Sequence, residues 1–230
     1  MDGTNMLRTT SSKPDPSATN AMHHRYQRLS SMYDGMEGLA ERRYHSWRTK
    51  LWQQVPGQHI LEVGVGTGKN MPFYPAGISI TGIDLTPGML QRAQKRVAEL
   101  GLKSRVNLYL GDAQELNFSN AAFDSGVATF VFCSVPDPVL GLRKLKRVVR
   151  PGGHILLLEH MRSPNLIVGA LMDFLNPLIV RIMGANINRQ TVENVRRAGL
   201  EIEQVENLGA GGIFKLIVAR VSPNKVDLIK

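Results

Sequence analysis

A glycine-rich loop between two apolar segments constrains the fold of this chain more than any other feature. Residues 60–68 read Ile-Leu-Glu-Val-Gly-Val-Gly-Thr-Gly, so an apolar strand runs directly into a loop with glycine at every second position. A second apolar stretch, residues 78–83, ends in Asp84. Glycine permits a sharp turn and close ligand approach, and an acid at the next strand end can accept hydrogen bonds from ribose hydroxyls. The pattern predicts a nucleoside-binding site on a doubly wound α/β sheet.

The spacing of the glycines separates two classes of cofactor. The dinucleotide fingerprint G-x-G-x-x-G needs a third glycine at position 69, where the chain has Lys69. The observed form is E-x-G-x-G-x-G, with Glu62 two residues before Gly64. A nicotinamide-dependent dehydrogenase is therefore not indicated. A glycine-rich turn without a ligand is the simpler alternative, but it would require neither Glu62 nor Asp84.

Composition narrows the class of protein and of partner. The chain has 230 residues and 43% hydrophobic residues, which suits one domain with accessory segments and a packed core. The single cysteine, Cys133, excludes an intramolecular disulfide and favours a reducing compartment. The net charge of +9 favours anionic partners such as nucleic acid or anionic lipid, although solubility alone would also explain it. Cysteine and histidine have no metal-ligand spacing, so we expect no metal.

From about residue 58, apolar strands alternate with helical stretches, which predicts a parallel sheet with right-handed crossovers. The expected strands are residues 59–63, 78–83, 106–110, 123–129 and 154–159, and the expected helices are residues 87–100, 139–149 and 191–198. Two more expected strands, residues 200–205 and 214–221, have only a glycine-rich turn between them and should pair antiparallel. The expected fold is a Rossmann-like, doubly wound sheet of seven strands, five parallel plus a C-terminal antiparallel hairpin.

The N-terminal part has a different character. Residues 1–20 are polar and lack the apolar segment of a signal peptide, so we expect a disordered tail. Residues 21–55 carry apolar side chains at steps of three and four, which predicts helices broken near residues 34–38. This segment is either a helix pair with solvated basic sides or a lid over the cofactor cleft whose basic rim meets a membrane or anionic substrate. The sheet domain would occupy residues 56–222, and residues 223–230 would form a C-terminal tail.

The longest apolar stretch, residues 166–183, is a poor candidate for a membrane-spanning helix. It contains Asp173, Asn176, Pro177 and Arg181, which are unfavourable in hydrocarbon. Such a segment can instead lie in the membrane interface.

Residues at the ends of the expected strands are candidate ligand contacts, because ligands of open α/β sheets bind there. Asp112 can accept a hydrogen bond from an adenine amino group and Ala113 leaves room for the ring, whereas the alternative for Asp112 is capping of the following turn. Phe130 lies in residues 129–134, which should face the cofactor. Cys133 has no basic partner at a recognisable spacing, which favours a packed residue over a nucleophile. His160 is either a base or phosphate ligand, or simply a hydrogen-bonded residue at a strand end.

Several of these segments together resemble the class I S-adenosylmethionine (SAM)-dependent methyltransferase domain. The segments are Ile60–Gly68, Ile80–Asp84, Gly111–Ala113, Phe118–Asp124 and Val149–Gly153. The resemblance covers about residues 22–220 and is strongest to the subgroup of quinone-biosynthesis C-methyltransferases and bacterial phosphatidylethanolamine N-methyltransferases. Phe132–Val135, Glu159-His160 and Asn186–Asn188 also look like methyltransferase-like membrane-associated proteins that alkylate thiols.

The resemblance implies SAM as the methyl donor. It places the glycines near the methionine part of SAM, Asp84 on the ribose and Asp112 on the adenine, and the complete expected set of cofactor residues is Glu62, Gly64, Gly66, Gly68, Asp84, Leu85, Asp112, Ala113 and Phe130. Tyr26 and Tyr33 lie seven residues apart on one helical face, and with His160 they are the catalytic candidates. The substrate-binding candidates are Tyr26, His160, Arg162, Arg181 and Arg189.

Three functions remain open at this point. The first is N-methylation of a phospholipid head group, phosphatidylethanolamine, by a cytoplasmic protein bound peripherally to the inner face of an anionic membrane. The second is methylation of a quinone carbon or of a small thiol or amine, and the third is a non-catalytic binding module of the same fold. The intact glycine loop argues against the third, and no aromatic-basic motif indicates nucleic acid. Methyl transfer is an in-line displacement, and the lack of an unmistakable base mildly favours an amine acceptor.

Overall fold

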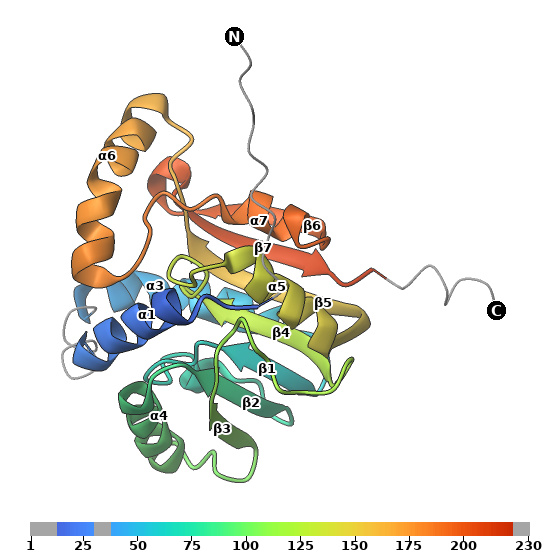
Figure 1. Ribbon diagram of the computed structural model, residues 1–230. Helices are drawn as coiled ribbons and strands as arrows, with labels where there is room; N and C mark the ends of the chain where they lie inside the picture. Colours follow the sequence, from blue (N-terminus) through green and yellow to red (C-terminus); the bar gives the residue numbers. More distant parts are fainter. Residues whose placement is uncertain (1–12, 30–37, 223–230) are drawn as a thin grey trace.

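The computed structural model describes residues 13–29 and 38–222, and in this part of the chain a twisted seven-stranded sheet lies between helices on both faces (Figure 1). The strands are β1 (His59–Val63), β2 (Ser79–Asp84), β3 (Val106–Leu110), β4 (Phe123–Thr129), β5 (Val149–His160), β6 (Glu201–Leu208) and β7 (Phe214–Arg220). The helices are α1 (Pro16–Leu29), α3 (Gly38–Gln53), α4 (Pro87–Glu99), α5 (Pro138–Val148), α6 (Leu166–Met183) and α7 (Thr191–Arg197), with short 3-10 turns at Met71–Phe73 and Ala210–Gly212.

The strand order is β3-β2-β1-β4-β5-β7-β6. Strands β1 to β5 pair parallel, whereas β7 runs antiparallel to both β5 and β6. The predicted seven-stranded fold with a C-terminal antiparallel hairpin is therefore confirmed. The order reverses between β1 and β4, so the carboxyl ends of β1, β2 and β4 meet at the edge where ligands of such sheets bind.

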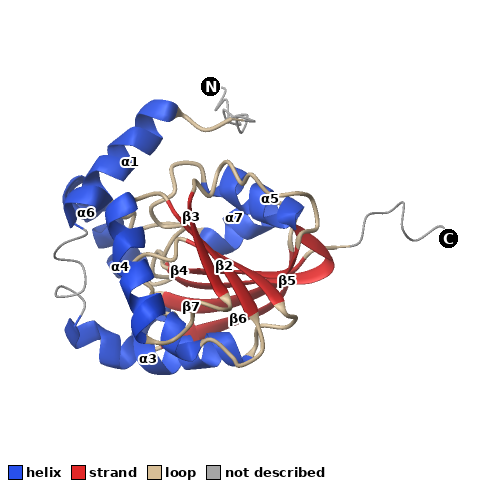
Figure 2. Ribbon diagram, turned by 90° about the horizontal axis from the view of Figure 1, so that it is seen from below, coloured by secondary structure: helices blue, strands red, loops and turns tan. Residues whose placement is uncertain are grey.

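The core has two apolar layers, one on each face of the sheet. Strand β5 supplies both through its alternation, with Leu157 facing α5 and α7 and Leu156 facing α3 and α4. Figure 2 shows these two helix pairs on opposite faces of the sheet. The second half of α3 belongs to this core, because Trp47, Leu51 and Trp52 are buried.

Helical structure begins earlier in the chain than predicted. Helix α1 starts at Pro16, so the predicted disordered tail of residues 1–20 is wrong for residues 16–20. The Asp15 carboxylate accepts hydrogen bonds from the backbone N–H groups of Ser17 and Ala18, at 2.9 and 3.4 Å, and thereby caps the first turn. Pro16 at the first helical position supports the same start. The predictions for residues 1–12, 34–37 and 223–230 lie outside the described residues.

The apolar segment at residues 166–183 forms α6, which stands at the side of the domain in Figure 1. None of the helices in the described ranges combines the length and the apolarity that crossing a bilayer requires.

Candidate functional site

The glycine loop after β1 is shaped by two different constraints. Gly64 has φ +66°, and a Cβ there would lie 2.4 Å from the Val131 side chain, so this glycine allows the loop to pack against the residues that follow β4. Gly66 has φ +56°, but a Cβ there would meet only the Gly64 carbonyl oxygen at 4.0 Å. The space above Gly66 is therefore open to a ligand.

Asp84 joins this loop to the end of β2. Its Oδ2 atom accepts a hydrogen bond of 2.9 Å from the Gly66 N–H, and its Oδ1 atom accepts one of 2.9 Å from the Thr86 N–H. Burial raises the pKa of the Asp84 carboxyl above its usual value. The Thr86 hydroxyl also donates to this carboxylate, which leaves one of its four lone pairs to accept a hydrogen bond from a hydroxyl group of a ligand.

The main cleft of about 640 Å³, which includes its open mouth, lies above this loop. Its lining includes the apolar side chains of Ile83, Met89 and Phe130, and Met22 and Tyr26 of α1 cover it from the N-terminal part. The predicted cofactor residues that line the cleft are Gly64, Gly66, Asp84, Leu85, Ala113 and Phe130. A cleft with apolar side chains, a buried carboxylate and a glycine-rich backbone in its lining suits a nucleoside-containing cofactor.

A second, more polar cavity shares Gly64, Gly66 and Phe130 with the main cleft. It adds two cationic side chains, Arg48 from α3 and Lys69 from the glycine loop. Arg48 is only 5% exposed, so it does not belong to a solvated basic face, which was one of the two alternatives for this segment. The sequence showed Arg48 only as one of several basic residues on the helix.

Glu62 connects this cavity to the elements around it. Its carboxylate accepts a hydrogen bond of 2.7 Å from the Asn70 side chain and another from the Tyr74 hydroxyl. Arg48 in turn donates to the Asn70 amide oxygen at 2.7 Å. Burial raises the pKa of Glu62 to about 7, and the hydrogen bonds from Tyr74 and Asn70 oppose that rise. The network attaches α3 and the segment after the glycine loop to the end of β1. The sequence analysis did not identify Asn70 and Tyr74 as members of the site.

The other predicted cofactor residues lie close to the main cleft without lining it. Gly68 packs against Met71, and a Cβ there would lie 2.7 Å from that side chain. Asp112 accepts hydrogen bonds from the Gln114 backbone N–H at 2.8 Å and from the Thr19 hydroxyl at 3.3 Å. The turn-capping alternative for Asp112 is thus present, and its adenine contact remains a prediction.

The loop after β4 also lines the cleft, through Phe130, Val131 and Ser134. Phe130 has φ +57°, an uncommon conformation for a non-glycine residue. The buried Glu159 carboxylate holds the next two residues, because its Oε1 atom accepts hydrogen bonds of 2.9 Å from the N–H groups of Val131 and Phe132. Burial raises the pKa of Glu159 to about 7. Its other oxygen is buried and has no hydrogen-bond partner among the described residues.

The carbonyl groups of the same loop accept hydrogen bonds from the segment that follows α6. Arg189 donates to the carbonyl oxygens of Cys133 and Val135 at 3.3 and 2.8 Å. Asn186 donates to Cys133 through its backbone at 2.9 Å and through its side chain at 3.0 Å. Arg189, a predicted substrate residue, therefore positions the loop in this structure, and sequence reasoning did not identify Glu159 or Asn186 as partners of this loop.

The catalytic candidates have different surroundings. Tyr26 lines the cleft, and burial raises the pKa of its phenol well above the usual value, so the phenol stays protonated. His160 does not line the cleft, and burial lowers its pKa to about 4, so its ring is neutral near pH 7. Burial also raises the pKa of the Cys133 thiol, which makes a thiolate nucleophile unfavourable. Tyr33 lies outside the described residues.

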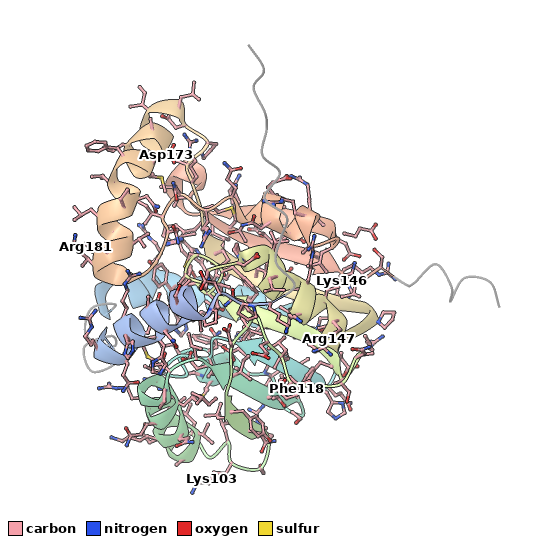
Figure 3. All side chains as sticks on the ribbon, in the orientation of Figure 1. Lys103, Phe118, Lys146, Arg147, Asp173 and Arg181 are labelled. Carbon is pink, nitrogen blue, oxygen red and sulfur yellow. The ribbon has the colours of Figure 1, made fainter. Side chains whose placement is uncertain are left out.

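Two predicted substrate residues lie on or beside α6 and not at the cleft. Arg162 forms an ion pair of 2.9 Å with Asp173. Arg181 is exposed near the C-terminal end of α6 and points away from the sheet in Figure 3. The substrate roles of both residues remain predictions.

Comparisons with known proteins agree with this geometry. The family model described as a methyltransferase domain matches residues 61–157. The chain is 40% identical over 174 residues to a phosphatidylethanolamine N-methyltransferase of Cereibacter sphaeroides, an alignment that covers 74% of this chain and 83% of that protein. It is 31% identical over 172 residues to a ubiquinone/menaquinone biosynthesis C-methyltransferase of Paracoccus denitrificans, which covers 71% of this chain and 68% of that protein.

Solved structures extend the likeness of the fold. The crystal structure of the [4+2]-cyclase SpnF superposes with a TM-score of 0.72 at 19% identity and covers 93% of this chain and 100% of that chain. At this identity the likeness concerns the fold alone. The glycine loop, the strand order and the sequence similarity over most of the chain lead to one family: the chain belongs to the class I SAM-dependent methyltransferases.

Proposed function

We propose that this methyltransferase transfers a methyl group from SAM to the amino group of phosphatidylethanolamine at an anionic membrane surface. The proposal rests on the similarity to a phosphatidylethanolamine N-methyltransferase. The two chains are 40% identical in an alignment that covers 83% of that enzyme. The net charge of +9 supports the membrane part of the proposal, because a basic protein is attracted to anionic lipid.

The residues of the two cavities fit SAM by the chemistry of their donors and acceptors. Asp84 offers an acceptor lone pair for a ribose hydroxyl, and the open space above Gly66 allows the cofactor to approach the backbone. The apolar side chains of Ile83 and Met89 suit the faces of an adenine ring. Arg48 and Lys69 in the second cavity suit the carboxylate of the methionine part.

SAM supplies a methyl group on a sulfonium, which an amine can accept without a metal or a strong base. The protein must hold the acceptor nitrogen in line with the methyl group and exclude water. Tyr26 covers the cleft, and Phe130 and Val131 form the wall that Glu159 and Arg189 hold in place. An ammonium acceptor must first lose one proton to solvent water, before the cleft closes over the amine. The protonated Tyr26 phenol can then accept a hydrogen bond from a remaining N–H group through its lone pairs.

A quinol carbon is the second candidate acceptor, because the chain is 31% identical to a quinone C-methyltransferase. Carbon attack calls for a definite base in contact with the acceptor. His160, with its pKa lowered to about 4, is a weak base and does not line the cleft, whereas Tyr26 remains protonated. This arrangement favours an amine over a ring carbon.

A panel of acceptors tests the proposal. Purified protein and methyl-labelled SAM are incubated with vesicles that contain phosphatidylethanolamine, with soluble glycerophosphoethanolamine, or with a demethylated quinol. We expect label in the phospholipid, and little in the two other acceptors. Label that enters only the quinol would replace the proposal by its alternative.

A further inference from the structure

Helix α6 presents an apolar stripe to solvent. Ile167, Leu171, Phe174, Leu178 and Ile182 follow at steps of four, three, four and four residues, so they lie on one face of the helix. Their exposed fractions are 81, 55, 81, 56 and 62%, respectively. An exposed stripe of this size on one helix marks an interaction surface.

The opposite side of α6 is attached to the domain largely through polar contacts. The Asn176 side chain accepts a hydrogen bond of 2.9 Å from the Ile187 N–H and donates one of 3.3 Å to Asn186. Asp173, the only acidic residue of the helix, pairs with Arg162 and accepts a hydrogen bond from Asn188. A surface helix of a globular protein usually buries its apolar face, whereas α6 exposes it.

The C-terminal end of α6 lies beside the cleft. Gly184, which ends the helix, is so close to Tyr26 that an added Cβ would lie 3.3 Å from the tyrosine ring. Asn186 follows and holds the Cys133 carbonyl in the loop that forms the cleft wall. Figure 1 shows this end of α6 next to α1. A surface that α6 touches is therefore close to the mouth of the cleft.

Positive charge borders the stripe. Arg181 is exposed on α6 itself, and α1 contributes Arg25, whose Cδ would lie 3.6 Å from a Cβ on Gly184, and the exposed Arg28. An apolar face with a cationic border matches the acyl chains and the anionic head groups of a lipid surface. A second copy of this chain fits less well, because both copies carry a net charge of +9 and would repel each other.

We propose that α6 lies in the interface of an anionic bilayer, with Ile167, Leu171, Phe174, Leu178 and Ile182 inserted, and holds the cleft mouth at the level of the head groups. The lipid acceptor in this statement rests on the proposed function, whereas the binding to the bilayer does not. The consequence for the reaction is that the lipid amine reaches Tyr26 without extraction of the lipid from the membrane.

The test uses co-sedimentation of the full chain with phosphatidylcholine vesicles that contain phosphatidylglycerol. The double variant Phe174→Asp/Leu178→Asp places two charges in the stripe, and its apparent affinity should fall at least about tenfold. The matched control, Leu100→Asp/Val205→Asp, adds the same charge at exposed apolar residues outside α6, which are 44 and 40% exposed. The control should stay within about twofold of the wild-type affinity, because ordinary surface substitutions have small effects.

A second readout reports insertion directly. In Phe174→Trp the new indole should shift its fluorescence to the blue when anionic vesicles are added, while the buried Trp47 and Trp52 give a constant background. Equal loss of binding in both double variants, or no fluorescence shift in Phe174→Trp while the protein sediments, would overturn the proposal. A change in oligomeric state of the α6 variant with unaltered vesicle binding would assign the stripe to a second copy instead.

Activity separates this inference from the proposed function. Methylation is measured on vesicles and on soluble short-chain phosphatidylethanolamine. The α6 variant should lose transfer on vesicles and keep it on the soluble lipid. If the wild-type protein binds vesicles through α6 and methylates neither lipid, the proposed function fails and the inference stands. If the α6 variant methylates vesicle lipid as the wild type does, the inference fails and the proposed function stands.

Discussion

Glu159 and Val131 are joined by a hydrogen bond of 2.9 Å from the Val131 backbone N–H to the Glu159 Oε1 atom. This bond crosses from the end of β5 to the loop after β4, and the same oxygen also holds Phe132. Because Val131 lines the cleft, a buried carboxylate that does not itself line the cleft determines the shape of one wall.

We predict that Glu159→Ala lowers the free energy of unfolding by about 2–4 kcal/mol, because two buried N–H groups lose their acceptor and a cavity forms. Glu159→Gln keeps an acceptor oxygen and should cost less than half of that. Urea unfolding of the three proteins measures both values. A loss below about 0.5 kcal/mol in Glu159→Ala would show that the bonds do not hold the loop.

The pKa of Glu159, raised from 4.5 to about 7 by burial, predicts a specific pH dependence. Since the folded protein binds this proton more tightly than the unfolded chain, the stability that the carboxyl contributes is full below about pH 4.5 and is lost as the pH rises through 7. The loss should be on the order of 2 kcal/mol between pH 5 and 8. Glu159→Gln cannot titrate at this position, so its unfolding free energy should fall less over the same range. Parallel curves for the two proteins would contradict the assignment, and Glu62, which titrates in both, cancels in the comparison.

Asp84→Ala should weaken SAM binding by roughly 1.5–3 kcal/mol through the loss of a hydrogen bond to the ribose. Asp84→Asn should be nearly as harmful, because both carboxylate oxygens accept backbone N–H groups and an amide must turn its own N–H toward Gly66 or Thr86. Isothermal titration calorimetry measures the affinities. Unchanged SAM binding in Asp84→Ala would remove Asp84 from the cofactor site.

Removal of residues 1–29 should abolish methyl transfer and leave the sheet folded. The deletion takes away Met22 and Tyr26, which cover the cleft, and it retains Trp47 and Arg48, which are buried. A cut at residue 50 would remove these buried residues too, so it would not separate the lid from the core. Circular dichroism checks that the sheet stays folded, and the transfer assay checks that activity is lost. Full activity of the shortened chain would refute a role of α1.

The sequence predicted the sheet better than it predicted the side-chain contacts of the site. The bounds of β1, β3 and β4 were predicted correctly, because apolar runs are local signals, and a glycine follows directly after β1 and β3. The side-chain contacts that support the Glu62 network and the loop after β4 include pairs far apart in the sequence. Arg48 and Asn70 lie 22 residues apart in the chain, and Arg189 reaches a carbonyl 54 residues away at Val135. The sequence shows that Arg48 is a basic residue of an expected helix, but only the packing of α3 against the glycine loop shows that it is buried.

The most direct test of the account is mass spectrometry of a mixed lipid extract incubated with the wild-type protein and SAM carrying a deuterated methyl group. The account predicts labelled methyl groups in the head-group fragment of phosphatidylethanolamine and no labelled quinone. The Asp84→Ala variant should give no labelled lipid under the same conditions. A labelled quinone with unlabelled phosphatidylethanolamine would contradict the account.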